Sequence, residues 1–509
     1  MNVGRLSLDN IDRFGETPTL SFEGNTYTNV ERDAYAGRLA RALQAHGVKP
    51  DDMVVVMMPN SPAVTAAFQA IWKIGAVVIP VTPMLSAREV GFILADSEAR
   101  VAVTSLALAG RLAEAAARAP EFREMLVIGR TETPGAVDIE AEIAAADPIP
   151  SLLDRADDDL ALLLYTSGTT GVPKGVMLTH MNLWSNVHAV AQNNPLPPGL
   201  RTMHVLPLSH SYGILMMNLG YVLGTNSALL THWDTARVFQ TIQDFGVERF
   251  SVVPTMLTYM INFPERERYD LSKLRRVNTG AASLLNEIRT QFERVFNVIV
   301  KEGYGLSETA PTLTGYHEDE PYRPGSVGRP IPGVEVCIMD FENRALPTGA
   351  RGEICARGPN VMKGYWKLEG ATREAMAGGW FHTGDIGFMD AEGYVYITDR
   401  KKDLIIKGGE NISPREIEEG LQEHEDVAEV AVFGVPDPTF GEEIVAAVVL
   451  KPGRRATEAA LKEHLAGYVT KFKVPSRIVF LPALAKNPTG KIQKREIRQE
   501  VLAGPLAAR

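Results

Sequence analysis

The alternation of short apolar runs with helical segments is the feature that most constrains the fold of this chain. Residues 51–82 read as a buried strand (MVVVMMPN), a helix (SPAVTAAFQAIWKIG) with Ser61 as its cap, and a second strand (AVVIPV). The helix-to-strand order recurs in REVGFILADSEA with RVAVTS, TARVFQTIQDFGV with RFSVVP, and LLNEIRTQFERVFN with VIVKEGYG. Such alternation predicts an α/β fold in which crossover helices connect parallel strands.

The composition and the strand pattern of the sequence change near residue 325. Glycine and proline become frequent, and the strands shorten to GVEVCIMD, GEICARG and GYVYITD, which predicts antiparallel β structure that closes a large domain. The charged segment DRKKDLIIKGGENISP follows, and we interpret it as a hinge. Beyond it, helical and strand patterns alternate over about a hundred residues, which predicts a small α+β domain. A chain of 509 residues is too long for one core, so at least two folding units are expected.

Composition excludes some classes of function. The formal net charge is −10, which argues against a general nucleic-acid binder because such a protein needs basic surface. The two cysteines, Cys337 and Cys355, lack the spacing of a metal site or a redox pair, so we expect buried structural thiols and a cytoplasmic protein. The N-terminal residues show no apolar signal core, and the longest apolar run is interrupted by Lys73. No membrane span is therefore expected.

A polar loop follows the apolar run LLLY at residues 162–165. The stretch YTSGTTGVPKGV supplies hydroxyl groups from threonine and serine, glycines that allow an anion to approach the backbone, and the cation of Lys174. It is not the common P-loop, which opens directly into a helix, because Pro173 disfavours helix there. Taken alone, the loop is equally typical of a surface turn and of a mobile phosphate-binding flap.

Four further stretches carry polar groups in patterns that suit nucleotide chemistry. EGYGLSETAP (302–311) places Tyr304 between glycines and before Ser307 and Glu308, and GWFHTGDIG (379–387) places Asp385 after a Thr-Gly pair that predicts a tight turn. The other two are TDRKKDLIIKGGENISPREIE (398–418) and NPTGKIQKREIR (487–498), which contains Lys491. Each alone is more typical of a strand end, a turn or a solvated basic segment.

Together and in this order, the stretches resemble the adenylate-forming superfamily, which contains acyl-CoA synthetases, peptide-synthetase adenylation domains and luciferases. The resemblance covers nearly the whole chain, and it includes LPLSHSYG, TGAASL, GEICARGPNVMKGYW and GVPDPTFGE besides the five stretches above. It implies an α/β N-terminal adenylating domain (1–399) of parallel αβαβα layers with a small β-barrel-like subdomain. A hinge (400–403) and a mobile α+β C-terminal domain (404–509) would follow.

The resemblance implies a ligase that activates a carboxylic acid with ATP and Mg²⁺, releases pyrophosphate, and transfers the acyl group to coenzyme A. Lys491 would then be the cation between the carboxylate and the α-phosphate, Glu308 the magnesium ligand, and His210 a group near the carboxylate. The residues implied to bind the nucleotide are Thr166, Ser167, Gly168, Thr169, Thr170, Gly171, Lys174, Ala281, Ala282, Tyr304, Gly305, Ser307, Asp385 and Arg400. Ser307 stands where the family more often has threonine, and the hydroxyl is kept.

The resemblance also implies how the acyl group is held and passed on. Lys402 matches the hinge residue, and Gly408 and Gly409 match a loop through which pantetheine passes. The residues that match the acyl tunnel are Tyr212, Met216, Gly280, Ala281, Gly303, Pro311 and Thr312. Small residues with one aromatic and one methionine suit a medium-sized apolar acid.

Several alternatives stay open. An amide ligase that transfers the acyl group to an amine such as an amino acid would share every motif above. A peptide-synthetase module and a luciferase-type oxygenase are less favoured, and a catalytically inactive nucleotide-binding regulator would have no need of Lys491, Glu308 and Asp385. The partners expected are small molecules, with no nucleic acid, and the chain is expected to be a monomer or a homodimer.

Overall fold

The computed structural model describes residues 1–149, 151–166, 173–486 and 492–503. The chain divides into two compact units. The first comprises residues 1–336 and 356–381, and the second comprises residues 337–355 and 382–509. The predicted domain boundary at residues 400–403 remains a prediction.

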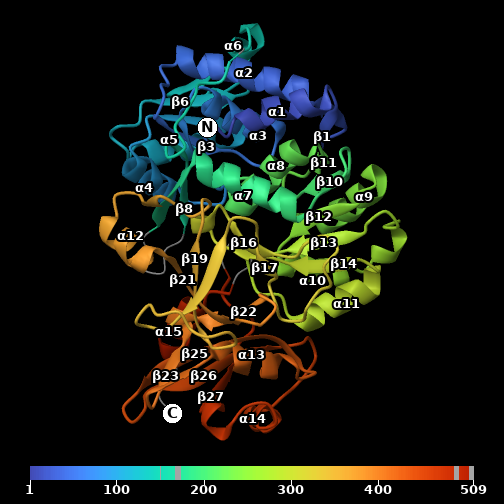
Figure 1. Ribbon diagram of the computed structural model, residues 1–509, viewed down its shortest axis with the longest axis vertical. Coiled ribbons are helices and arrows are strands. Elements are labelled where there is room, and N and C mark those ends of the chain that lie inside the picture. The colour runs from blue at the N-terminus through green and yellow to red at the C-terminus, as the bar shows by residue number, and fades with distance from the viewer. Residues whose placement is uncertain (150, 167–172, 487–491, 504–509) are drawn as a thin grey trace. The chain divides into compact units, whose positions relative to one another are not determined.

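Two large sheets form the framework of the first unit (Figure 1). The eight-stranded sheet has the order β20-β9-β8-β4-β3-β5-β6-β7, with the bounds Gly364–Tyr365, Lys174–Thr179, Leu160–Thr166, Val77–Pro80, Met53–Met57, Val101–Ser105, Glu124–Ile128 and Ala136–Asp138. The seven-stranded sheet has the order β14-β13-β12-β10-β11-β1-β2, with the bounds Ile299–Glu302, Arg276–Thr279, Arg249–Val252, Arg201–His204, Asn226–Leu229, Pro18–Phe22 and Asn25–Thr28. Neighbouring strands are parallel except for β9, β20 and β2, which run antiparallel at sheet edges.

Helices cover both faces of each sheet, which confirms the α/β prediction. The helices between the sheets are α1 (Arg5–Phe14), α2 (Asn29–Ala45), α3 (Pro62–Lys73), α7 (His180–Asn193) and α8 (Ser211–Leu223), and one apolar cluster joins them to both sheets. The outer helices are α4 (Ala87–Ser97) and α5 (Leu106–Ala116) on the eight-stranded sheet, and α9 (Thr235–Phe245), α10 (Pro254–Ile261) and α11 (Asn286–Phe296) on the seven-stranded sheet. Two short helices, α6 (Glu140–Ala145) and α12 (Glu369–Ala375), complete the unit.

Local sequence signals explain where these elements begin. Ser61 caps α3, because its hydroxyl accepts a hydrogen bond from the backbone N–H of Val64 at 3.4 Å, and proline occupies the first helical position. Thr179 and Ser86 start α7 and α4 with reciprocal capping boxes. The prediction of Ser61 as a cap is therefore confirmed.

Three smaller sheets follow the large ones along the chain. One has the order β15-β16-β17 (Tyr304–Gly305, Thr312–Gly315, Arg329–Pro330) and is antiparallel. The next has the order β18-β19-β21-β22 (Glu335–Met339, Gly352–Arg357, Phe381–Met389, Val395–Arg400), and most of it belongs to the second unit. The last is built from β23 to β27 (Ile405–Lys407, Glu410–Ile412, Val427–Asp437, Gly441–Leu450, Arg477–Phe480).

The second unit is the α+β structure that the sequence predicts. Its helices are α13 (Pro414–Gln422), α14 (Glu458–Leu465) and α15 (Lys494–Ala503), and they pack on the sheet of β23 to β27. Both cysteines are free. Cys355 is buried as predicted, but Cys337 is partly exposed because it lies in β18, at the edge of its sheet. Among the described residues, no helix has both the length and the apolar character that crossing a membrane requires.

Candidate active site

The predicted phosphate loop joins two antiparallel strands. β8 ends at Thr166, β9 begins at Lys174, and these two residues pair in the strand register. The chain returns as a strand and not as a helix, which confirms the prediction drawn from Pro173. Ser167, Gly168, Thr169, Thr170 and Gly171 lie outside the described residues, as does Lys491, so their predicted roles stay predictions.

Lys174, Tyr365 and Glu308 lie together although they are far apart in sequence. The Lys174 ammonium lies 4.9 Å from the centre of the Tyr365 ring, and the Tyr365 hydroxyl donates a 2.9 Å hydrogen bond to Glu308. Burial raises the pKa of Tyr365, and the Glu308 carboxylate raises it further. The phenol therefore stays protonated and remains a donor to the carboxylate at neutral pH.

The loop that carries Ser307 and Glu308 is fixed by two buried amides. The side-chain N–H groups of Asn186 and Asn360 both donate to the carbonyls of Thr309 and Thr312, at 2.8–3.3 Å. The carbonyl of Asn186 also accepts the backbone N–H of Thr312 at 3.2 Å. These bonds anchor the segment 309–312, which directly follows Ser307 and Glu308, so the hydroxyl and the carboxylate are presented next to a rigid support.

Close backbone contact explains one glycine of this loop. A Cβ at Gly305 would lie 1.8 Å from the carbonyl oxygen of Pro311, so no other residue fits. Gly305 pairs with Thr312, and Tyr304 pairs with Thr314, across β15 and β16. Tyr304 is only 9% exposed, so its ring is largely enclosed by protein.

His210 directly precedes α8, at its N-cap position, and is positioned by a buried asparagine. Asn60 accepts the backbone N–H of Leu208 at 2.8 Å and donates to the carbonyl of Leu206 at 2.9 Å, which fixes the segment that leads to His210. Burial lowers the pKa of His210, so its imidazole is neutral at neutral pH. The next residue, Ser211, lies with its hydroxyl 3.4 Å from that of Ser307. The neutral imidazole of His210 and the hydroxyls of Ser211 and Ser307 are therefore available at the loop of residues 306–312.

The predicted acyl-pocket residues Tyr212, Gly280 and Gly303 meet in the structure. A Cβ at Gly280 would lie 3.7 Å from the Tyr212 ring and 3.1 Å from the carbonyl oxygen of Gly303, so a larger residue at this position would crowd the Gly303 carbonyl. Met216 accepts a hydrogen bond from the Ser251 hydroxyl at 3.1 Å. Burial raises the pKa of Tyr212 to about 12.

Ala281 and Ala282 follow Gly280, directly after strand β13. Ala281 has a positive φ of 67°, a conformation that favours glycine, and its side chain is exposed. Ala282 is partly buried. Such strain often marks a functional segment, which agrees with the prediction of a backbone contact to the base here.

In the second unit, Asp385 and Arg400 face each other across β21 and β22. They pair in the strand register, and the Arg400 guanidinium lies 2.8 Å from the Asp385 carboxylate. The Thr383–Gly384 pair lies inside β21, with Gly384 at a φ of 71°, and is not a turn. The prediction of a tight turn was wrong, because the chain continues as strand β21 through this glycine and pairs with β22 from Asp385 onward.

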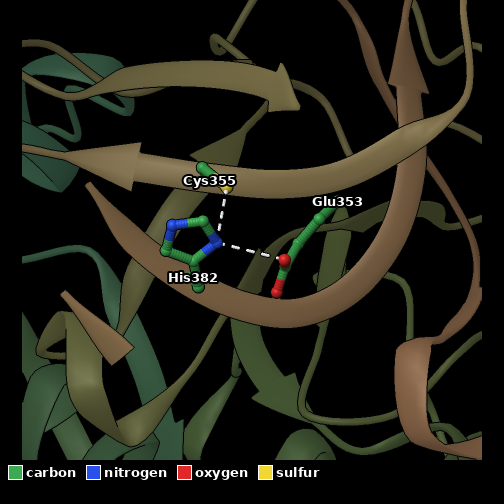
Figure 2. A group of neighbouring side chains, drawn as sticks. All are labelled: Glu353, Cys355 and His382. Atoms are coloured by element: carbon green, nitrogen blue, oxygen red, sulfur yellow. Dashed lines mark hydrogen bonds and ion pairs between the residues drawn. The ribbon is translucent and has the colours of Figure 1, made fainter. Parts of the chain in front are cut away.

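Glu353 organises the backbone just before Asp385. One of its carboxylate oxygens accepts the N–H of Gly384 at 3.0 Å. The other lies 3.0 Å from Nδ1 of His382 (Figure 2). The same oxygen accepts a 2.9 Å hydrogen bond from Lys401. Sequence reasoning missed this residue, because a glutamate in a strand carries no local signal.

Glu353, Cys355 and His382 also form a group whose donor atoms lie within 4.8 Å of one another (Figure 2). The Cys355 sulfur is 3.4 Å from Nδ1 of His382. Burial raises the pKa of the Cys355 thiol to about 12, so the thiolate that a metal prefers is disfavoured. The Lys401 ammonium already neutralises the carboxylate. The donor set therefore suits a hydrogen-bonded support better than a metal site.

The predicted acceptor loop lies between strands β23 and β24. Gly408 and Gly409 have φ values of 59° and 85°, which favour glycine. The rings of Phe440 and Phe472 flank Gly408, since a Cβ there would lie 3.6 Å and 3.5 Å from them. Lys407 lies 5.5 Å and 4.8 Å from the centres of the same two rings. Lys402, the predicted hinge residue, lies in a short 3₁₀ helix (Lys401–Asp403) with its side chain exposed.

The comparisons with known proteins identify the family. The sequence matches the family described as AMP-binding enzyme over residues 8–366, and the AMP-binding enzyme C-terminal domain over residues 416–491. It is 32% identical to a long-chain-fatty-acid–CoA ligase of Bacillus subtilis (strain 168), over 97% of this chain and 93% of that protein.

Solved structures agree with this assignment. ATP-bound MatB from Rhodopseudomonas palustris matches with a TM-score of 0.91 at 31% identity, over 99% of each chain. The amide bond synthetase McbA from Marinactinospora thermotolerans matches with a TM-score of 0.88 at 27% identity, over 98% of this chain and 99% of that one. The chain therefore belongs to the AMP-binding enzyme family. It is an AMP-forming carboxylate ligase, which activates a carboxylic acid with ATP to an acyl-adenylate and pyrophosphate.

Proposed function

We propose that this ligase transfers the acyl group from the adenylate to coenzyme A, which makes it an acyl-CoA ligase. The surface around Gly408 and Gly409 is the observation that carries the proposal. Two glycines at positive φ leave the backbone open to a thin pantetheine arm, and the flanking rings of Phe440 and Phe472 offer faces on which an adenine base stacks. Phe440 is 41% exposed, so its ring is available to a ligand.

For the first half-reaction, we propose that Lys491 neutralises the approach of one anion to another. A carboxylate and a phosphate with unit charges 4 Å apart repel by about 4 kcal/mol at an effective dielectric constant near 20. A cation between them removes this penalty and holds both groups in line for attack. The carboxylate oxygen then forms a bond to the α-phosphorus, and pyrophosphate leaves with the electrons of the broken P–O bond.

The other roles in this half-reaction are proposed on the same basis. Thr166 and Lys174 would hold the phosphates with the loop between them, and Ser307 the α-phosphate. Tyr304, Ala281 and Ala282 would enclose the base, and Asp385 with Arg400 the ribose. His210, neutral because of its burial, would contact the substrate carboxylate without adding charge.

Glu308 fits the role of magnesium ligand. Its carboxylate and the neighbouring Ser307 hydroxyl are the oxygen donors that this ion prefers, and the Tyr365 hydroxyl orients the carboxylate. Bound there, Mg²⁺ would supply positive charge against the phosphates of ATP. Tyr365 in turn is fixed by the 2.9 Å hydrogen bond from its backbone N–H to the Thr372 hydroxyl.

The identity of the acyl acceptor is tested by identifying the reaction product. Acids that support ATP–pyrophosphate exchange are incubated with ATP and either coenzyme A or a mixture of amino acids, and the products are identified by mass. We expect the acyl thioester and AMP. Formation of amides and no thioester would contradict the proposal.

Substitution of Phe440 tests the acceptor surface separately. Aromatic stacking contributes about 0.5–1.5 kcal/mol, so Phe440→Ala is expected to raise the KM for coenzyme A about 3- to 10-fold. Pyrophosphate exchange should not change. Tyr468→Ala is the matched control, because Tyr468 is an exposed aromatic of the same unit that is bonded to Glu423. An equal effect of both substitutions would contradict this role of Phe440.

Lys491→Ala tests the proposed cation. It is expected to abolish adenylation while thioester formation from supplied acyl-adenylate persists. Lys486→Ala, which removes a nearby lysine bonded to Glu429, should change neither step. Equal loss of both half-reactions in Lys491→Ala would contradict the assignment.

The proposed hinge is tested by Lys402→Pro, which locks φ at this residue. We expect adenylation to be retained and thioester formation to be lost. Unchanged rates of both steps would contradict the hinge.

An amide ligase is the second candidate function. The likeness to an amide bond synthetase favours it, since that protein matches this chain over nearly its full length. The same product analysis separates the two. We further propose a cytoplasmic location, supported by two free cysteines, and a monomeric or homodimeric state.

A further inference from the structure

One face of the seven-stranded sheet is polar across three neighbouring strands. In β12, β13 and β14, Arg249 pairs with Arg276, Ser251 with Asn278, and Asn278 with Lys301. Residues two apart in a strand share a face, so these five side chains lie on one side of the sheet. Their neighbours in the strands, Phe250, Val277 and Val300, belong to the apolar core on the other side of the sheet.

The polar face is continuous with the predicted acyl pocket. Gly280 directly follows β13, two residues beyond Asn278 and four beyond Arg276, and a Cβ there would lie 3.7 Å from the Tyr212 ring. At about 3.3 Å per residue, Arg276 lies about 13 Å from Gly280 along the strand. Ser251, on the neighbouring strand, bonds to Met216 of the pocket. The face therefore extends from the predicted pocket wall toward its far end.

Three cations on this face share few carboxylates. Arg249 binds Glu318 through two hydrogen bonds of 2.9 and 2.6 Å, and Arg276 binds the same carboxylate at 2.7 Å. The Arg276 guanidinium also donates to the side-chain carbonyls of Asn278 at 3.0 Å and Asn194 at 3.3 Å, which are neutral groups. The Lys301 ammonium donates to the backbone carbonyls of His317 and Glu318, at 3.0 and 2.8 Å. Glu320, a further carboxylate that acts on Lys301, is paired with Arg329. The cluster thus has more positive than negative charge.

This charge is held away from water. The Arg276 and Lys301 side chains are almost fully buried, at 4% and 6% exposure. Burial and the neighbouring guanidinium groups lower the pKa of Lys301 to about 8 and that of Arg276 to about 10. Buried cations without full compensation are costly, and the cost is recovered when an anion binds beside them.

We propose that Arg276, with Lys301 and Asn278, forms a specificity site at the far end of the acyl pocket that selects acids bearing a second acidic group, a carboxylate or a sulfonate. The site deepens the proposed function and rests on it, because it acts on the acid that the ligase activates. An alkyl chain of the same length would place methylene groups against guanidinium and amide groups and gain nothing from them. Such an acid differs from the medium-sized apolar acid that the predicted pocket residues suit.

The experiment is ATP–pyrophosphate exchange with two matched series of acids. One series contains the straight-chain dicarboxylates from succinate to pimelate, and the other contains the monocarboxylates from butyrate to heptanoate. We expect at least one dicarboxylate to exceed its matched monocarboxylate more than 10-fold in kcat/KM. A preference for monocarboxylates at every length would overturn the inference and leave the ligase function standing, whereas no exchange with any acid would contradict the ligase function itself.

Arg276→Met is expected to lower kcat/KM for the preferred dicarboxylate 30- to 100-fold while the value for its monocarboxylate stays within 3-fold. Arg276→Lys should recover part of the loss. Asn278→Leu is the second variant should Arg276→Met fail to fold, and it should shift the preference in the same direction by about 10-fold. The KM for ATP and the melting temperature report on folding. Equal losses for both acids in a variant with normal melting would overturn the inference.

Discussion

The two large sheets of the first unit share a topology but differ in the chemistry of their faces. In the eight-stranded sheet, Val54 and Val56 of β3 face the helices between the sheets while Val55 and Met57 face α4 and α5, so both faces are apolar. In β12 to β14 of the seven-stranded sheet, one face is apolar and the other carries arginine, lysine, serine and asparagine. The comparison shows that the eight-stranded sheet serves as an apolar scaffold, whereas strands β12 to β14 of the seven-stranded sheet offer a polar face, the wall of the proposed specificity site.

The largest effect is expected from Lys73, a lysine buried at the end of α3. Lys73 is 2% exposed and lies 2.9 Å from Asp33. Lys73→Ala leaves this carboxylate without its cation and is expected to lower the free energy of unfolding by about 3–5 kcal/mol, measured by denaturant titration. The double variant Lys73→Met with Asp33→Asn should recover much of the loss. A loss below about 1 kcal/mol in Lys73→Ala would show that this pair is not needed by the scaffold.

A pair of truncations contrasts the two sheets directly. Leu162 in β8 is fully buried, so Leu162→Ala is expected to cost about 2–5 kcal/mol in the free energy of unfolding. Ser251 in β12 is 5% exposed, donates to the Met216 sulfur and also bonds to the Tyr212 side chain, so Ser251→Ala should cost about 1 kcal/mol. Thermal and urea unfolding of both variants measure the contrast. Equal costs would remove the distinction between scaffold and binding wall.

Gly280→Val tests the wall of the pocket. The new side chain would lie against the Gly303 carbonyl and the Tyr212 ring, and it would occupy space that the acid needs. We expect kcat/KM for the acid to fall about 30-fold, which corresponds to about 2 kcal/mol, with an unchanged KM for ATP. Gly110→Val is a control for stability, because no atom lies within 4 Å of a Cβ at Gly110. An increase in the KM for ATP equal to the loss for the acid would contradict the placement of Gly280.

Glu353→Gln tests the support of Asp385 in the second unit. The amide keeps one acceptor for Gly384 and loses the charge that attracts His382 and Lys401. We expect the KM for ATP to rise about 5- to 10-fold with little change in kcat. Glu353→Asp should raise this KM more than Glu353→Gln does, because the aspartate side chain is shorter. A change in kcat alone would argue against a role in positioning.

The smallest effect concerns pH. The pKa of Lys301 is lowered to about 8 by burial, so its charge is lost as the pH rises through 8, while an unfolded lysine keeps its proton to a higher pH. The unfolded chain therefore binds more protons than the folded one in this range, and the free energy of unfolding rises between about pH 8 and 10. The groups that face it are Arg249, Arg276, Glu318 and Glu320, and Arg276 keeps its proton to about pH 10. The preference for dicarboxylates should fall about 3-fold between pH 7 and 9, measured as a ratio of kcat/KM values. A constant ratio would exclude Lys301 from the site.

Much of the fold was predictable because its signals are local. The apolar runs around residues 53–57, 77–80 and 249–252 became strands, and the segments between them became helices. Pro173 disfavours a helix because it lacks an N–H, independently of what packs around it, and the chain continues from Lys174 as strand β9. Asn186 and Asn360 gave no signal, because a single amide in a helix or loop looks like surface until its partners are known.

The polar wall of the seven-stranded sheet was missed for a related reason. Alternation of arginine and serine with phenylalanine and valine in RFSV is typical of a strand with one face in solvent. Burial of that face follows from the helices that lie over it, which no local pattern contains. The contact of Tyr365 with Glu308, 57 residues apart, has the same origin.

The sequence by itself determined the order of the elements, the division into a large α/β part and a small α+β part, and the motifs that place the chain in its family. These depend on backbone preferences and periodicities within a few residues. Only the tertiary structure decided which polar side chains are buried together, because burial depends on layers contributed by distant segments. Glu353 beside Gly384, and Arg276 behind Gly280, acquire their meaning from that packing, and the choice of acid depends on the second of them.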